Sequence, residues 1–145
     1  MKIKDIMTKN VKTAAPETSL EEVARLMRGH SIGSIPVMKG EQLVGFVTDR
    51  DMVTRALTEG LDPRTTPIGE IMTPHVFHVS EEQDVQEAAW LMEIKRVRRL
   101  VVLDAKGRLT GLLALSDISG QLEDRDLAGE VLEHVTRENA TTIRL

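Results

Sequence analysis

Two segments of the chain carry apolar residues at helical spacing. Leu20, Val23, Ala24 and Met27 fall at i, i+3, i+4 and i+7, which places them on one face of an α-helix. The same spacing returns 65 residues later, between Val85 and Met92. Each segment is therefore predicted to be a helix that buries one apolar stripe.

Polar residues predict where these helices begin and end. Ser19 and Glu22 fit a capping box, in which the serine hydroxyl accepts a backbone N–H and the glutamate bonds back to the cap. Asp84 and Glu87 repeat the same device before the second helix. Gly29 is predicted to end the first helix, because glycine adopts left-handed backbone geometry at little cost.

Short apolar runs on either side of a glycine-containing turn follow each predicted helix. A further helix is predicted after each pair of runs. Each half of the chain therefore reads strand, helix, strand, strand, helix, with strands at 35–38, 43–47, 100–103 and 109–113 and second helices starting near Thr48 and Ser116.

The chain is an internal duplication. The triplet Ile-Met-Thr at 6–8 recurs at 71–73, and Gly-Phe-Val-Thr-Asp-Arg-Asp at 45–51 aligns with Gly-Leu-Leu-Ala-Leu-Ser-Asp at 111–117. Since each copy is too short to bury a good core alone, the two copies are expected to pack on each other. The predicted fold class is α/β (α+β), with two βαββα units related by a pseudo-twofold axis.

Composition narrows the classes of function. The 145 residues carry a net charge of −4, which argues against a nucleic-acid binder, and they include no cysteine, which excludes disulfides and thiolate chemistry. The N-terminus lacks the apolar core of a signal peptide, and no stretch is long enough to span a membrane, so a cytoplasmic protein is expected. With only Phe46, Phe77 and Trp90 as aromatics, a bound base would lie between aliphatic side chains.

The segment from Thr48 to Asp51 carries the most informative candidate chemistry. A strand is expected to end at Val47 and a helix to begin near Thr48, so free backbone N–H groups there would favour a phosphate. Thr48 could bond a phosphate oxygen, and Asp51 could accept from the vicinal hydroxyls of a ribose. The alternative is that Thr48 is only a helix cap and Asp51 only an acid favoured by the helix dipole.

These motifs, in this order and in duplicate, closely resemble a tandem pair of CBS (cystathionine β-synthase) domains, a Bateman module. The resemblance implies two clefts that bind adenosine-containing ligands (AMP, ADP, ATP, and in some members NAD or S-adenosylmethionine), and frequent homodimerisation. It implies a free-standing signal-transduction module that regulates a partner protein. The predicted organisation is repeat one at 1–61, a proline-containing linker at 62–67, repeat two at 68–124, and a C-terminal helix or tail at 125–145 that is either a dimer contact or a cap.

The resemblance also implies binding residues in two unequal clefts. Thr48 would bind phosphate and Asp51 ribose in the first cleft, whereas Ala114, which matches Thr48, has no hydroxyl, although Ser116 lies close to it in sequence. The first cleft is therefore predicted to bind nucleotide better. The remaining first-cleft residues are Val76, Phe77, His78, Val97 and Arg98; the second cleft would use Asp117 for ribose, Lys12, Ile32 and Gly33 around the base, and Arg98 or Arg99 near phosphate.

Two groups of side chains leave alternatives open. The cations at 95–99 are either a solvated loop or phosphate contacts through Arg98 and Arg99. His75 and His78 point to opposite faces of an extended segment, so no metal site is predicted. No catalytic constellation stands out, so the expected function is a non-enzymatic adenine-nucleotide sensor; the alternative is a ligand-independent dimerisation or scaffold module.

Overall fold

The structure is a computed structural model that describes residues 1–120 and Glu133. The chain forms two compact units. The repeat-one unit is Val11–Val76, and the repeat-two unit is Met1–Asn10 together with the chain from Phe77 onward. Both units mix helices and strands, as predicted, but they begin and end at different residues from the sequence repeats.

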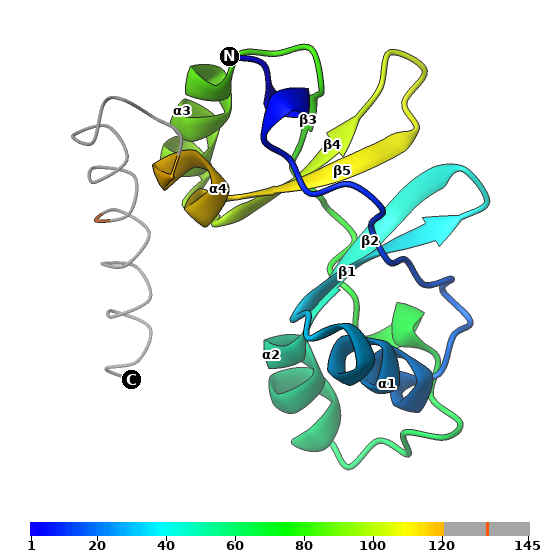
Figure 1. The fold of residues 1–145 in the computed structure, drawn as a ribbon. Coiled ribbons are helices and arrows are strands. Elements are labelled where there is room, and N and C mark those ends of the chain that lie inside the picture. The colour runs from blue at the N-terminus through cyan, green and yellow to red at the C-terminus, as the bar shows by residue number, and fades with distance from the viewer. Residues whose placement is uncertain (121–132, 134–145) are drawn as a thin grey trace. The chain divides into compact units, whose positions relative to one another are not determined.

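The repeat-one unit is built on a hairpin, which Figure 1 shows in cyan. Strands β1 (Ser34–Lys39) and β2 (Gln42–Thr48) are antiparallel, with Ser34 opposite Thr48. Gly40 closes the turn at φ +61°, a conformation that glycine adopts without strain. The unit also contains α1 (Leu20–His30), α2 (Asp49–Asp51), a π-helical continuation (Met52–Leu57) and a 3₁₀ turn (Ile68–Glu70).

The predicted first strand of this unit is reduced to a single parallel bridge between Ala14 and Val37. The core below the hairpin consists of apolar side chains from α1, both strands and the 3₁₀ turn. Its buried members are Ala14, Leu20, Val23, Met27, Ile35, Val37, Val47, Ala56, Ile68 and Ile71.

The repeat-two unit has a three-stranded sheet in the order β3–β4–β5. Strand β3 (His78–Ser80) runs parallel to β4 (Arg99–Leu103), which pairs antiparallel with β5 (Leu109–Ala114). Helices α3 (Val85–Lys95) and α4 (Leu115–Ser119) and the 3₁₀ turn Ile3–Asp5 complete the unit. Its buried core members are Ile3, Val79, Val85, Ala88, Ala89, Met92, Leu100, Val102, Leu113, Leu115 and Ile118.

The two Ile-Met-Thr triplets each pair with the hairpin of the other sequence repeat. Thr8 exchanges backbone hydrogen bonds with Leu112 at 2.8 and 3.0 Å, and Thr73 does so with Phe46 at 2.8 and 2.9 Å. For this reason residues 1–10 join the repeat-two unit and residues 68–76 join the repeat-one unit. The predicted linker at 62–67 lies inside the repeat-one unit, where the carbonyl of buried Thr66 accepts the Leu20 N–H at 3.0 Å.

The helix starts follow the prediction closely, and the first helix end does not. Ser19 caps α1 by accepting the Glu22 N–H at 3.2 Å. The predicted end at Gly29 is wrong, because α1 continues to His30 and Ser31 takes the left-handed conformation at φ 52°. Arg96 does the same after α3 at φ 53°. Hydrogen bonding back to the helix is thus completed by non-glycine residues in both units.

Two further expectations on the helices need correction. Asp84 caps α3 through the Gln86 N–H at 2.9 Å, while the Glu87 carboxylate accepts from Gln83 Nε2 at 2.8 Å. Ala24 was expected in the buried stripe of α1 but is exposed. Small, exposed Ala24 still suits a helix, because alanine has the highest helix propensity.

The predicted C-terminal element at 125–145 lies outside the described residues, apart from the single position Glu133. In the part of the chain that the structure describes, every helix is too short or too polar to cross a membrane.

Candidate ligand-binding site

The turn from β2 into α2 is closed by a reciprocal cap. Thr48 Oγ1 accepts the Asp51 N–H at 3.1 Å, and Asp51 Oδ2 accepts the Thr48 N–H at 2.9 Å. The two intervening N–H groups are also used: Asp49 donates to the Gly33 carbonyl at 2.9 Å and Arg50 to Asp49 Oδ1 at 2.9 Å. The expectation of free N–H groups for a phosphate is therefore wrong at residues 48–51.

What this turn offers a ligand is side-chain oxygen. The Thr48 hydroxyl accepts one hydrogen bond and still has its own hydrogen to donate. Asp49 and Asp51 bring two carboxylates, which repel a phosphate and attract hydroxyl donors. The local chemistry thus fits a sugar hydroxyl better than a phosphate group.

The two oxygens of the Asp51 carboxylate have different surroundings. Oδ2 is held by the cap, whereas Oδ1 lies 3.6 Å from Arg55 Nε, and only 15% of the Asp51 side chain is exposed. Arg55 in turn donates through Nη1 to the Ile71 carbonyl at 3.0 Å and to Thr73 Oγ1 at 3.1 Å. Arg55 is not among the predicted site residues, although it contacts the Asp51 carboxylate.

The matching turn of the repeat-two unit keeps the backbone contacts and loses the hydroxyl. Asp117 Oδ2 accepts the Ala114 N–H at 2.8 Å, but Ala114 has no side-chain oxygen to return the bond. The Leu115 N–H donates to the Arg98 carbonyl at 2.8 Å, as Asp49 does to Gly33. Leu115 is buried, so this turn carries one carboxylate fewer than its counterpart.

Several predicted site residues gather at one end of the repeat-two sheet. Arg99 stands opposite Ala114 in the β4–β5 ladder. The Phe77 carbonyl accepts the Val101 N–H at 3.3 Å, which places Phe77 and His78 beside the same end of β4. The other predicted residues found here are Val97, which packs partly buried against the core, exposed Arg98 and Ser116, and half-buried Asp117.

Phe77 and Lys95 form a contact that the sequence reading did not anticipate. Lys95 Nζ lies 5.5 Å from the centroid of the Phe77 ring, which is 42% exposed. A cation at this distance is attracted by the negative face of the ring. The Phe77 ring therefore lies beside the exposed cation of Lys95. Lys95 precedes the exposed Arg98 and Arg99 by three and four residues in sequence.

The remaining predicted residues lie in the repeat-one unit. Gly33 adjoins the Thr48–Asp51 turn, and a Cβ there would lie 3.0 Å from Asp49 Oδ2. Ile32 packs partly buried against the core, Val76 is half-buried at the end of the unit, and Lys12 is exposed. The grouping of residues from both units into two clefts stays a prediction.

The duplication also has an independent signature. A family model of the CBS domain matches residues 3–57 and, a second time, residues 68–124. The chain belongs to the CBS-domain family.

Individual CBS proteins resemble this chain over most of its length. CBS domain-containing protein YhcV of Bacillus subtilis is 33% identical over 137 residues, which cover 94% of this chain and 96% of that protein. The structure of CBSX2 in complex with AMP has a TM-score of 0.70 at 28% identity, covering 82% of this chain and 93% of the other. The CBS domain pair of MJ0100, in complex with 5-methylthioadenosine and S-adenosyl-L-methionine, has a TM-score of 0.72 at 30% identity, covering 83% and 95%.

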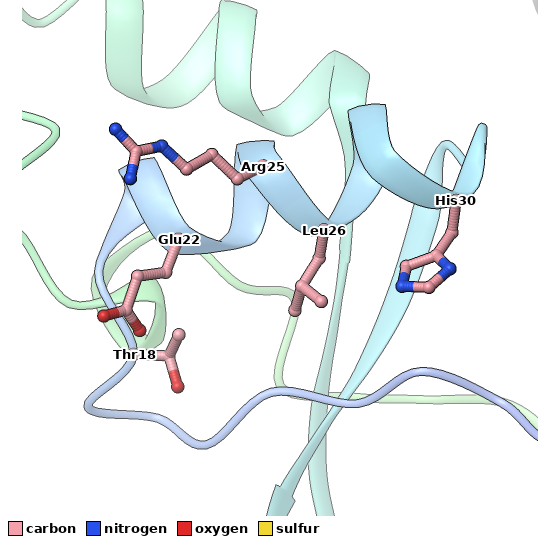
Figure 2. A pocket seen from close by; sticks show the side chains of 5 residues that line it. All are labelled: Thr18, Glu22, Arg25, Leu26 and His30. Atoms are coloured by element: carbon pink, nitrogen blue, oxygen red, sulfur yellow. The ribbon is translucent and has the colours of Figure 1, made fainter.

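The repeat-one CBS domain also carries a shallow groove along α1, with a volume of about 390 Å³. Glu22, Leu26 and His30 follow one another at i, i+4 and i+8, and Figure 2 shows all three pointing to one side of the helix. Arg25 also lines the groove, and its side chain runs along the helix towards Glu22. Thr18 completes the lining. Within residues 1–120 and at Glu133, no three His, Asp or Glu side chains lie together as metal ligands would.

Proposed function

We propose that this CBS pair is a regulatory module, non-catalytic and cytoplasmic, that binds an adenosine-containing ligand of the AMP, ADP or ATP type. The observation that carries the proposal is the Asp51 carboxylate in α2, three residues after the end of β2. Its Oδ2 is held by the cap at 2.9 Å, which leaves Oδ1 to accept a ribose hydroxyl. Relatives of similar fold are known with AMP or with S-adenosyl-L-methionine and 5-methylthioadenosine bound, and all three ligands contain adenosine.

The phosphate contacts are proposed to come from side chains. The N–H groups of residues 48–51 are already used, so a phosphate needs the Thr48 hydroxyl or cations from elsewhere. Arg98 and Arg99 are exposed, and the planar fork of a guanidinium suits phosphate oxygens. Phe77, His78, Val76 and Val97 are proposed for the base of the ligand bound through Asp51, and Lys12, Ile32 and Gly33 for the base of the ligand bound through Asp117.

The site that contains Asp51 is proposed to bind more tightly than the site that contains Asp117. Thr48 supplies a hydroxyl that Ala114 cannot, although Ser116 follows two residues later. Binding alone does not make a switch: the ligand must bind one conformation of the pair better than another, and the regulated partner protein then responds to that difference.

The experiment is a melting and calorimetric titration with AMP, ADP, ATP, NAD and S-adenosylmethionine. A ligand at a hundredfold excess over its Kd raises stability by about 2.7 kcal/mol. Asp51→Asn keeps an oxygen for the Thr48 N–H but replaces the second acceptor, so it should weaken binding by at least about tenfold, the loss of one charged hydrogen bond. Asp117→Asn is the matched control and should cost less. A larger loss from Asp117→Asn would reverse the ranking.

A second candidate function is a ligand-independent homodimerisation or scaffold module. Trp90 and Ile94 lie one turn apart on α3 and are 62% and 50% exposed. The matching positions on α1 are Arg25 and Gly29. An exposed apolar pair that a related helix replaces with a polar residue and a glycine is typical of a contact surface.

Sedimentation distinguishes the two candidates. Trp90→Arg places the residue of the matching α1 position on α3 and should convert a dimer to a monomer, whereas Arg25→Ala should leave the dimer intact. A dimer that Trp90→Arg dissociates, together with no melting shift by any nucleotide at millimolar concentration, would favour the scaffold. A wild-type protein that sediments as a monomer would contradict it.

A further inference from the structure

Arg55 connects Asp51 with residues 71–73, which lie 16 to 18 residues beyond Arg55 in sequence. Its Nε faces Asp51 Oδ1 at 3.6 Å, and its Nη1 donates to the Ile71 carbonyl at 3.0 Å and to Thr73 Oγ1 at 3.1 Å. One guanidinium therefore contacts both the proposed ribose carboxylate and the Ile-Met-Thr segment that pairs with β2 at Phe46. Because a guanidinium is planar, stays charged and carries several donors, it can contact these groups at the same time.

Arg55 faces the oxygen of Asp51 that the ligand would use. Oδ2 is engaged by the Thr48 N–H, so Oδ1 is the oxygen left for a hydroxyl. At 3.6 Å the guanidinium is too distant for a full hydrogen bond and close enough to orient the carboxylate by charge. A hydroxyl that donates to Oδ1 then shares this oxygen with Arg55.

The helix that carries Arg55 has an unusual local geometry. Residues Met52–Leu57 form a π-helical turn directly after Asp51, in which Thr58 donates to the Val53 carbonyl at 3.3 Å. A π-helical turn widens the helix and changes the direction of its side chains relative to an α-helix. Arg55, which contacts both the Asp51 carboxylate and residues 71–73, lies in this π-helical turn.

The repeat-two unit lacks this connection at the level of sequence. Position 121, which matches Arg55, is glutamine, while Ile6 and Thr8 match Ile71 and Thr73. Asp117 therefore keeps its cap and the segment opposite β5 but has no arginine at the matching place. The arginine is specific to the repeat that also has the hydroxyl of Thr48.

We propose that Arg55 is a positioning residue that orients Asp51 for a ribose diol and couples occupation of that carboxylate to the segment Ile71–Thr73. This segment is followed by the last residues of the repeat-one unit, which ends at Val76. Because coupling is reciprocal, changes at Thr73 alter ligand affinity through Arg55. The inference rests on the proposed function.

The test uses AMP and ATP, each beside its 2′,3′-dideoxy analogue, in calorimetric titrations of the whole protein. Arg55→Gln should weaken both ribonucleotides about tenfold and change both dideoxy analogues less than about twofold, because only the diol reaches Asp51. Arg55→Lys should restore part of the loss. Thr73→Val should weaken ribonucleotide binding slightly, and Thr8→Val is its matched control. Arg25→Gln, which removes an exposed ion pair on α1, should leave both ligands unchanged.

Equal losses for the ribo and dideoxy ligands would overturn the inference, because they would show a general structural defect. Unchanged ribonucleotide affinity in Arg55→Gln, with a clear loss in Asp51→Asn, would also overturn it and leave the proposed function standing. Failure of the wild-type protein to bind either nucleotide would refute both.

Hydrogen exchange supplies a readout of the coupling itself. Without ligand, the Arg55→Gln variant should exchange the amides of residues 71–73 and 75–76 faster than wild type. AMP should change the exchange of these amides in wild type and not in the variant. Identical exchange in the two proteins without ligand would show that Arg55 does not hold the segment.

Discussion

The repeat-one and repeat-two units share backbone hydrogen bonds and differ in the side chains at the same places. The bond from Asp49 N–H to the Gly33 carbonyl has its counterpart from Leu115 to Arg98, and the Thr73–Phe46 bridge has its counterpart in Thr8–Leu112. Even the left-handed residue after the long helix recurs, at Ser31 and at Arg96. These shared contacts give hydrogen-bond partners to backbone groups at the same places in both units.

The differences concentrate on the sequence of the turn after the hairpin and on one position of the long helix. Thr48, Asp49 and Arg55 in repeat one stand against Ala114, Leu115 and Gln121 in repeat two. On the long helix, Arg25 stands against Trp90, which is 62% exposed. The two copies therefore share their backbone hydrogen bonds and differ in surface chemistry. The Thr48–Asp51 turn of repeat one is suited to a polar ligand, and α3 of repeat two has an exposed apolar residue.

Methionine packed on glycine is the closest shared contact, and changing it should have the largest effect. A Cβ on Gly45 would collide with Met72 Sδ, and a Cβ on Gly111 would lie 2.5 Å from Met7 Sδ. Gly45→Ala and Gly111→Ala should each lower the free energy of unfolding by about 1–3 kcal/mol, measured by urea titration with circular dichroism. Gly111→Ala should cost more, because the Thr8 carbonyl lies 2.9 Å from its Cβ and backbone cannot rotate away.

Gly29→Ala is the matched control for these glycine substitutions. Nothing lies within 4 Å of a Cβ at Gly29, which sits inside α1. Alanine should therefore stabilise the protein there by about 0.5–1 kcal/mol, the opposite sign. Destabilisation by Gly29→Ala equal to that of Gly45→Ala would show that close packing is not what distinguishes the two hairpin glycines.

The cap that repeat one has and repeat two lacks should have an intermediate effect. Thr48→Ala removes the acceptor of the Asp51 N–H and should cost about 1 kcal/mol. Ala114→Thr introduces the same hydroxyl at a residue whose backbone is already extended (φ −102°, ψ 155°) and should recover a similar amount. The measurement is again urea unfolding. A loss from both substitutions would show that the two turns are not equivalent.

Features that depend on neighbouring residues could be predicted from sequence. The Ser19 and Asp84 caps, both hairpins and the periodic helices follow from spacing within a few residues, and the structure has all of them. The predicted helix end at Gly29 is wrong because α1 continues to His30, and the Ser31 N–H closes it with hydrogen bonds to the Arg28 and Met27 carbonyls. Glycine permits a left-handed turn but does not require one.

Features that depend on distant partners could not be predicted. The N–H of Asp49 donates to the Gly33 carbonyl, so the turn predicted to be open to a phosphate is closed by a neighbouring segment. Arg55 reaches Ile71 and Thr73 across 16 to 18 residues, a contact that no local pattern encodes. The pairing of each Ile-Met-Thr segment with the hairpin of the other sequence repeat could not be predicted either, because it joins residues that are distant in sequence.

The residues just before the two Ile-Met-Thr segments make different ionic contacts. The effect of pH on stability should reveal this difference, and it is the smallest effect expected here. Glu82 Oε2 accepts from Lys2 Nζ at 2.6 Å and Oε1 from Lys4 Nζ at 2.8 Å, and these hydrogen bonds lower the pKa of Glu82 to about 2. The matching acid in repeat one is Glu17, and the residues that match the lysines are Pro67 and Gly69, which carry no charge.

Glu82→Gln should therefore lower the melting temperature at neutral pH by less than Thr48→Ala does, because both partners are solvent-exposed. A lowered pKa in the folded state stabilises the protein above the ordinary glutamate value of 4.5, and this contribution is lost as the pH falls toward about 2. The difference in melting temperature between wild type and Glu82→Gln should be largest above about pH 5 and should disappear as the pH falls toward about 2. It should also shrink at high salt. Glu17→Gln is the matched control and should lower the melting temperature at neutral pH by less than Glu82→Gln does, because no lysine stands at the matching positions. An equal loss at both positions would mean that the lysines do not distinguish the two units.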